Sequence, residues 1–89
     1  MTKRGKLEIM RDILKIVQEN KSIKPTPLLR KSNLSSSGYK EYYEEILSRQ
    51  LVTESLDKNG AKIILITEKG IIFLQKYNVI IDFIDEFEL

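Results

Sequence analysis

Apolar residues near the start of the chain recur at three- and four-residue intervals, which is the spacing of one face of an α-helix. The positions are Leu7, Met10, Ile13, Leu14 and Val17, with Ile9 and Ile16 widening the stripe. This pattern predicts an amphipathic helix over residues 6–19, and Asn20 is a suitable residue to end it.

A second, shorter helix is predicted after a break that contains two prolines. The residue before a proline avoids the helical conformation, so Lys24 marks the end of the preceding segment. Thr26 followed by Pro27 is typical of an N-cap and a first helical residue, which predicts a helix over residues 27–32. Ile23, just before the break, allows a short extended segment.

A third helix is predicted over residues 36–49. Ser32 and Asn33 form a turn signal, and Leu34 followed by Ser35 is typical of a hydrophobic residue that precedes an N-cap. Apolar and aromatic residues then recur at helical spacing, at Tyr39, Tyr42, Tyr43, Ile46 and Leu47.

Two runs that favour β-strands follow, at residues 51–55 and 61–66, and Asn59-Gly60 lies between them. An Asn-Gly pair between two such runs is the strongest short-range signal for a hairpin. Thr67 is then expected to cap a last helix that begins near Glu68. Three helices, a two-stranded wing hairpin and a long C-terminal helix predict an α+β fold of the winged helix-turn-helix type.

The last helix carries an apolar seam with the spacing of a coiled coil. The seam consists of Phe73, Tyr77, Ile80, Ile84 and Phe87, with Ile81 beside it. One winged domain can cover only the first half of this helix, so the second half would expose a large apolar patch in a monomer. We therefore expect residues 1–70 to form the winged domain and residues 71–89 a dimerisation helix. The alternative is a tail that folds back onto its own domain.

Two stretches of the chain resemble patterns found in a family of small archaeal winged-helix DNA-binding proteins. The first contains Asn33-Leu34-Ser35, Tyr39, Tyr42, Ile46, Leu47, Leu51 and Val52, and the second contains Ile66-Thr67-Glu68-Lys69-Gly70 and Phe73-Leu74. With the first helix, the resemblance covers about residues 6–77. It implies a homodimer whose last helices pair as an antiparallel coiled coil and whose two winged domains bind duplex DNA. The family includes chromatin-like proteins and predicted transcription regulators.

The chain departs from the pattern of that family at three places. Gln50 stands where a glycine usually follows the third helix, and Ile64 stands where the second wing strand commonly has an aromatic residue. Gly38 and three glutamates lie on the expected recognition helix. The first two departures concern packing, whereas the third concerns the ability of this helix to face DNA.

Charge is divided unevenly along the chain. Residues 1–50 carry eleven Lys and Arg against six Asp and Glu, whereas residues 51–89 carry four against seven, within a net charge of +2. A basic first half suggests a surface that faces a polyanion. Ordinary scatter of surface charge is the alternative.

The resemblance implies that this polyanion is duplex DNA, and serines and free N–H groups at a helix N-terminus suit phosphate contacts. The candidate DNA-binding residues are Lys3, Arg4 and Lys6 in an N-terminal arm, Arg30 and Lys31 on the second helix, Ser35, Ser36, Ser37 and Lys40 at the start of recognition helix 36–49, and Lys58 and Lys62 on the wing, residues 57–62. Gly38 weakens the helix but leaves room for a DNA backbone. Glu41, Glu44 and Glu45 oppose binding, so the alternative is a solvated helix face without a role in DNA binding.

An enzyme is not expected, and neither is a cofactor or a metal site. The chain has no histidine and no cysteine, which removes the commonest catalytic base and the usual zinc ligands. Asp57-Lys58-Asn59-Gly60 lacks the downstream carboxylate of a calcium-binding loop. Since disulfides are also excluded, oligomerisation is the remaining source of additional burial for so short a chain.

The sequence as a whole predicts a dimeric double-stranded DNA-binding protein, either a transcription regulator or a chromatin-type architectural protein. No apolar stretch of a signal peptide follows the charged N-terminal residues, and the apolar segments are too interrupted to span a membrane. We therefore expect a cytoplasmic, nucleoid-associated protein. The alternative function is a winged-helix protein–protein interaction module that does not bind DNA.

Overall fold

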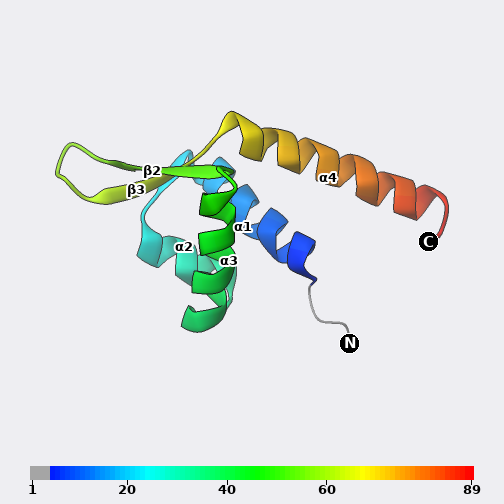
Figure 1. The fold of residues 1–89 in the computed structure, drawn as a ribbon, viewed down its shortest axis with the longest axis horizontal. Coiled ribbons are helices and arrows are strands. Elements are labelled where there is room, and N and C mark those ends of the chain that lie inside the picture. The colour runs from blue at the N-terminus through cyan, green and yellow to red at the C-terminus, as the bar shows by residue number, and fades with distance from the viewer. Residues whose placement is uncertain (1–4) are drawn as a thin grey trace.

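The computed structural model describes residues 5–89 of the chain. Its elements are, in order, α1 (Lys6–Asn20), β1 (Ser22–Ile23), α2 (Pro25–Ser32), α3 (Ser36–Ser48), β2 (Val52–Leu56), β3 (Lys62–Ile66) and α4 (Glu68–Glu86). Figure 1 shows α1, α2 and α3 packed together, with the β2–β3 hairpin and the far end of α4 extending in opposite directions. The predicted winged helix-turn-helix fold is confirmed.

Helix α1 lies at the centre of the core. Its residues Ile13, Leu14 and Val17 are completely buried, and Leu28 of α2, Ile46 of α3 and Ile64 of β3 pack into the same cluster. The whole cluster comprises Ile9, Met10, Ile13, Leu14, Val17, Ile23, Leu28, Ile46, Leu51, Val52, Ile64 and Leu74. Each element of the domain therefore contributes to one hydrophobic core through the periodic apolar positions seen in the sequence.

The sheet has three antiparallel strands in the order β1-β3-β2. The predicted hairpin pairs Val52 with Ile66 at one end and Leu56 with Lys62 at the other. The short extended segment expected at Ile23 becomes a third strand, which pairs Ile23 with Ile64. Because Ile23 is buried, this strand anchors the hairpin to the helices.

Helix α2 begins two residues earlier than the sequence predicted. Lys24 is the N-cap and Pro25 is the first helical residue, so the prediction that Thr26 caps the helix is wrong. Both prolines lie in the first turn, where a backbone N–H has no intrahelical partner to lose. Pro25 at the first helical position and Pro27 at the third therefore both fit without the loss of a hydrogen bond.

The end of α3 is closed by Gln50, whose φ is 62°, in the left-handed region. The N–H of Gln50 bonds to Leu47 O at 3.0 Å and the N–H of Leu51 bonds to Ile46 O at 3.1 Å, the two hydrogen bonds of a Schellman motif. Glycine adopts this conformation at the lowest cost, and glutamine adopts it here with backbone strain. The departure from the family glycine thus changes the residue but not the geometry of the turn.

The start of α4 is fixed against this same turn. Thr67 is the N-cap: its Oγ1 accepts the Gly70 N–H at 3.0 Å and donates to Gln50 O at 2.7 Å. The Thr67 N–H also bonds to Leu51 O at 3.1 Å. A Cβ at residue 70 would overlap the Leu51 carbonyl oxygen, so only glycine fits. The Thr-Glu-Lys-Gly stretch is therefore a structural junction, which we call the α3–α4 junction (residues 50, 51, 67 and 70).

Two tyrosines connect α3 to the sheet. The rings of Tyr39 and Tyr43 stack with centroids 5.5 Å apart, and the Tyr43 hydroxyl donates to Glu54 Oε2 on β2 at 2.5 Å. Tyr43 has a partly buried position between Tyr39 and Glu54. This contact joins α3 to β2 of the wing.

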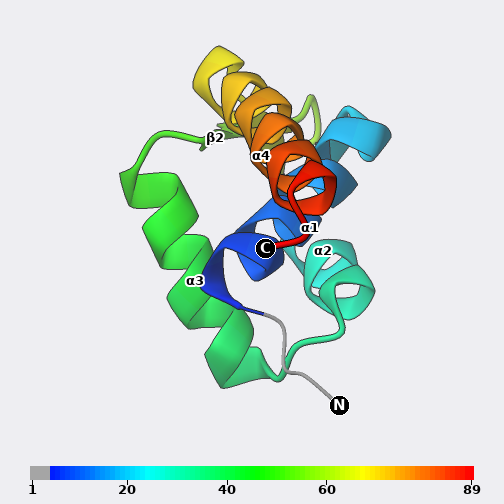
Figure 2. The ribbon, with the colours of Figure 1, turned by 90° about the vertical axis from the view of Figure 1, so that its right-hand side faces the viewer.

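The two ends of the molecule are separated by the helical body. Figures 1 and 2 both show the N-terminal end of α3 on the side of the body opposite α4. The far half of α4 extends beyond the body, and the molecule is elongated, with extents of 49 × 28 × 21 Å. A surface at the start of α3 and a surface on the far half of α4 can therefore be used at the same time.

Alkaline pH should weaken this fold through the two stacked tyrosines. Burial, followed by the charge of Glu54, raises the pKa of Tyr39 from 10.0 to about 12, and burial with the hydrogen bond to Glu54 raises the pKa of Tyr43 further. A raised pKa means that the neutral hydroxyl is favoured by folding, so this stabilisation is present below pH 10.0 and is lost as the pH rises above it.

We expect the free energy of unfolding in urea to fall above pH 10.0 in the wild type and to fall less in Tyr43→Phe. Near neutral pH, Tyr43→Phe should cost about 1 kcal/mol for the lost hydrogen bond. Tyr42→Phe serves as the control. Equal alkaline slopes for the wild type and Tyr43→Phe would contradict the role of the Tyr43–Glu54 contact.

Candidate nucleic-acid interface

The first turn of α3 presents free hydrogen-bond donors at the surface. Ser35 is the N-cap, and its Oγ accepts the Gly38 N–H at 3.1 Å, as the sequence predicted for a cap. Ser36 and Ser37 follow at the exposed helix start, together with Lys40 one turn later. The remaining N–H groups of this turn and the positive end of the helix dipole point toward the same space, which suits an anion.

Gly38 has a local structural role beside any role in DNA binding. A Cβ at this residue would lie 3.1 Å from Ser35 Oγ, closer than an ordinary van der Waals contact. The glycine therefore leaves room for the capping hydroxyl, and it also leaves the outer side of the first turn without a side chain. Glycine at this position weakens the helix by up to about 1 kcal/mol.

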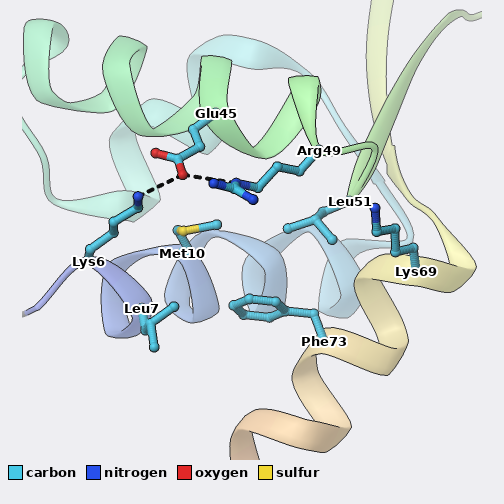
Figure 3. A pocket seen from close by; sticks show the side chains of 8 residues that line it. All are labelled: Lys6, Leu7, Met10, Glu45, Arg49, Leu51, Lys69 and Phe73. Carbon is cyan, nitrogen blue, oxygen red and sulfur yellow. Dashed lines mark hydrogen bonds and ion pairs between the residues drawn. The ribbon is translucent and has the colours of Figure 1, made fainter.

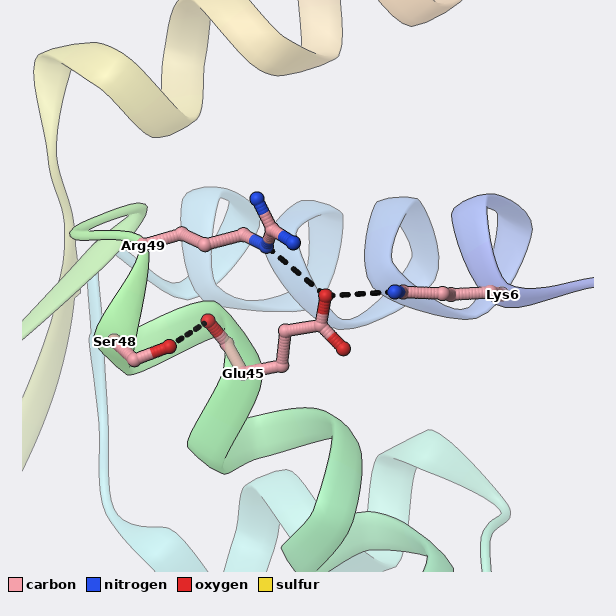
Figure 4. A network of polar contacts seen from close by, with 4 residues as sticks. All are labelled: Lys6, Glu45, Ser48 and Arg49. Atoms are coloured by element: carbon pink, nitrogen blue, oxygen red, sulfur yellow. Dashed lines mark hydrogen bonds and ion pairs between the residues drawn. The ribbon is translucent and has the colours of Figure 1, made fainter.

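One of the three glutamates on α3 is neutralised inside the protein. Glu45 Oε2 lies 2.8 Å from Lys6 Nζ and 2.9 Å from Arg49 Nε, and Ser48 donates to the Glu45 backbone oxygen (Figure 4). Hydrogen bonds from Lys6 and then from Arg49 lower the pKa of Glu45. Glu45 therefore joins α1 to α3 and presents little charge to a ligand at the other end of the helix.

Glu41 and Glu44 remain on the exposed face of α3. Helical spacing places Ser37, Lys40, Glu41 and Glu44 on one side, so the acidic residues follow the serines and the lysine along the same face. A polyanion that approached the middle of this helix would meet two carboxylates. Only the first turn and Lys40 are thus suited to phosphate.

The predicted basic residues do not form one continuous patch. Lys6 is held by Glu45, and Lys62 Nζ lies 3.5 Å from Glu54 Oε1. Lys31 is exposed and lines a hollow with acidic residues of α1. Lys3 and Arg4 lie outside the described residues. The cations of the arm, of α2 and of the wing therefore differ in whether an acidic residue of the protein already lies close to them.

Three of the predicted cations are exposed, have no ion-pair partner within residues 5–89 and lie outside the hollow beside α1. They are Arg30, Lys40 and Lys58. Together with Ser36 and Ser37 they come from α2, from the start of α3 and from the wing. We call these five residues the α3–wing surface. The three cations can approach a phosphate without breaking an ion pair within residues 5–89, whereas the Ser37 hydroxyl is 3.4 Å from Ser35 Oγ.

Asp57 closes the wing loop through hydrogen bonds. Its Oδ1 accepts the N–H groups of Asn59 at 2.8 Å and Ala61 at 2.9 Å, and these contacts, the one to Ala61 above all, lower its pKa. Gly60 has a φ of +82°, a conformation that favours glycine and closes a three-residue hairpin loop. The loop therefore presents Lys58 on a fixed turn.

Sequence reasoning missed one basic residue near the wing. Lys24 is exposed at the N-cap of α2, directly after β1, which pairs with β3 of the wing, and its charge helps to lower the pKa of Asp57. The residue was assigned only to the break between two helices. Its position beside the loop depends on the pairing of β1 with β3, which the sequence did not predict as part of the sheet.

The exposed apolar band on α4 differs in part from the predicted seam. Ile80 and Phe87 of the seam are exposed, but Phe73, Tyr77, Ile81 and Ile84 are half-buried, and Tyr77 lies under Arg11 of α1. The exposed band consists of Ile72, Val79, Ile80, Phe83 and Phe87. Val79 and Phe83 lie outside the predicted seam. Phe83 and Phe87 are one turn apart, and their ring centroids are 4.9 Å apart.

Two further observations concern other kinds of site. Within residues 5–89, no three His, Cys, Asp or Glu side chains are grouped so that they could hold a metal ion. None of the helices in this part of the chain combines the length and the apolar character needed to cross a membrane.

Comparison with solved structures gives three similar folds. Sso10a-2, a DNA-binding protein from Sulfolobus solfataricus, matches with a TM-score of 0.78 and 21% identity over 96% of this chain and 86% of that one. SSV1 F-93 matches with a TM-score of 0.68 and 20% identity over 89% and 91%. A MarR-family transcriptional regulator from Silicibacter pomeroyi matches with a TM-score of 0.65 and 15% identity, over 81% of this chain but only 48% of that one.

The TM-scores show a shared fold, and at such low sequence identities they show the fold alone. No curated protein sequence matches the chain at the same level of significance. The model of the winged helix-turn-helix family matches residues 3–85, which is nearly the whole chain and includes the recognition helix, the wing and most of α4. The chain therefore belongs to the winged helix-turn-helix family.

Proposed function

We propose that this chain is a dimeric protein that binds double-stranded DNA, as a transcription regulator or as a chromatin-type architectural protein. The observation that carries the proposal is the α3–wing surface, where three exposed cations without ion-pair partners in residues 5–89 accompany the free donors of a helix N-terminus. The similarity in fold to Sso10a-2, a DNA-binding protein, supports it.

The distribution of charge favours docking through the DNA backbone. Ser36, Ser37 and Lys40 contact phosphates on one side of a groove, and Lys58 reaches phosphates from the wing. Glu41 and Glu44 keep the middle of α3 out of the groove because carboxylates repel phosphate. Such a mode depends strongly on salt and selects weakly among sequences.

Self-association is proposed from the exposed band on α4. Val79, Ile80 and Phe83 are each more than half exposed, on a part of the helix that extends beyond the body (Figure 1). Large contiguous apolar patches on small proteins mark interfaces. A dimer would also place two α3–wing surfaces on one assembly, which increases avidity for a duplex.

A second candidate function is a protein–protein interaction module that does not bind DNA. The exposed Glu41 and Glu44 on the recognition helix favour it. In that case the α3–wing surface is ordinary solvated surface. Recovery of a stoichiometric protein partner without nucleic acid would identify this function.

Binding to a short duplex should weaken steeply between about 50 and 200 mM salt, because each phosphate contact releases counterions. Lys40→Ala and Lys58→Ala should each reduce the slope of log affinity against log salt by about 0.9. Glu44→Gln should raise the affinity. Lys76→Ala is the matched control, since it removes an exposed cation from α4 and should leave the slope unchanged.

Two results would contradict the DNA-binding proposal. One is the absence of binding to any duplex at low salt, and the other is an equal effect of Lys76→Ala and Lys40→Ala on the slope.

The mass in solution should be twice the chain mass of 10.4 kDa. Ile80→Asp places a carboxylate in the exposed band and should convert the dimer to a monomer that keeps its helical circular dichroism. Gln75→Asp, on the exposed polar side of α4, is the control and should remain dimeric. A monomeric wild type at micromolar concentration would contradict the proposed dimer.

A further inference from the structure

A hollow of about 360 Å³ lies between α1, the end of α3 and the start of α4 (Figure 3). Its volume exceeds the roughly 30 Å³ that one water occupies in the liquid by about tenfold. The side chains that line it are Lys6, Leu7, Met10, Glu45, Arg49, Leu51, Lys69 and Phe73. We call it the α1–α4 pocket.

The floor of the α1–α4 pocket is apolar. Met10 and Leu51 belong to the hydrophobic core, Phe73 packs against that core, and Leu7 at the mouth is 55% exposed. An open hollow with such walls favours an apolar side chain over water, because burying apolar surface is favourable by about 25 cal/mol per Å².

The rim of the pocket is positively charged. Lys6, Arg49 and Lys69 surround it, and one carboxylate, Glu45, is shared by the first two. Lys69 is exposed and has no ion-pair partner within residues 5–89. An occupant with an apolar group and flanking negative charges would therefore complement both the walls and the rim.

The last turn of α4 has that chemistry. Phe87 is 58% exposed, and Asp85, Glu86 and Glu88 flank it without a cation between them. Phe87 cannot enter the pocket of its own chain, because it lies fourteen residues after Phe73 on one straight helix, or about 21 Å along the axis. Figure 1 shows this end of α4 pointing away from the body. The complementary group must then come from a second copy of the chain.

We propose that the α1–α4 pocket is a docking site for the last turn of α4 of a second copy, with Phe87 of the partner subunit in the pocket. The inference rests on the self-association proposed above and adds its geometry. If two α4 helices pair antiparallel about Ile80, Phe73 and Phe87 of the partner subunit face each other, since they lie seven residues before and after Ile80. The acidic residues of the partner then face Lys69 and Arg49.

Continuity with the exposed α4 band favours a second copy over a small apolar anion. Leu7 at the mouth of the pocket and Ile72 on α4 are both exposed, and the band continues from Ile72 along α4 to Phe87. One partner helix could cover the band and fill the pocket in a single contact. A small molecule would fill the pocket and leave the rest of the band exposed.

Cysteine crosslinking tests the arrangement directly, because the natural chain has no cysteine. Leu7→Cys and Phe87→Cys are both at exposed positions, so neither should disturb the fold. Mixing the two variants under mild oxidation should give a disulfide-linked heterodimer. Ile80→Cys alone should give a linked homodimer, because the two copies of residue 80 face each other across an antiparallel pair.

The results separate the inference from the proposal on which it rests. A monomeric wild type, or an unlinked Ile80→Cys with no mixed product, overturns both. A linked Ile80→Cys with no product from the Leu7→Cys and Phe87→Cys mixture leaves the dimer and overturns the occupancy of the pocket. A linked homodimer of Phe87→Cys alone indicates a parallel pair and likewise overturns the inference.

Charge reversal provides a second measurement. Lys69→Glu should reduce the yield of the Leu7→Cys and Phe87→Cys product at low salt, and combining Lys69→Glu with Glu88→Lys on the partner should restore it. Unchanged yields in both cases would contradict the contribution of the charged rim.

Discussion

The carbonyl oxygen of Leu51 accepts the N–H of Thr67, and the backbone of Gly70 packs directly against the same oxygen. This contact at the α3–α4 junction determines how the two ends of the molecule proposed to be functional, the start of α3 and the far half of α4, lie relative to each other. Gln50, in the left-handed conformation, turns the chain out of α3 so that Leu51 reaches this position. The Thr67 cap then starts α4 at a fixed point and direction. The N-terminal end of α3, the proposed recognition helix, and the far half of α4 are therefore held on opposite sides of one core.

Charge follows this separation. Ser36, Ser37 and Lys40 lie at the start of α3 and Lys58 lies on the wing, whereas the last turn of α4 is acidic and apolar. Several charges that a sequence alone counts as available form ion pairs at the surface: Lys6 and Arg49 with Glu45, and Lys62 with Glu54. The charges that remain support contacts with phosphates at the start of α3 and on the wing, and contact with a second copy of the chain at the end of α4. The two contacts use separate parts of the molecule, so one interferes little with the other.

Much of the fold could be predicted from local patterns, because helix α1, the caps at Ser35 and Thr67 and the wing hairpin each depend on residues close in sequence. The start of α2 was misplaced because two prolines fit within one first turn. The candidate site was less predictable, since the Lys6–Glu45 and Tyr43–Glu54 contacts join residues far apart in the chain. The α1–α4 pocket likewise forms from three helices that the sequence could not place relative to one another.

The most direct test of this account is the free energy of unfolding of Gly70→Ala. The added methyl group meets a backbone oxygen that cannot move without displacing α3 or α4, so a loss of about 3 kcal/mol is expected, at the upper end of the range for overpacking. Gln50→Gly in the same junction is the matched control and should gain up to about 1 kcal/mol by relieving the left-handed backbone. A Gly70→Ala variant as stable as the wild type would contradict the central role of the junction.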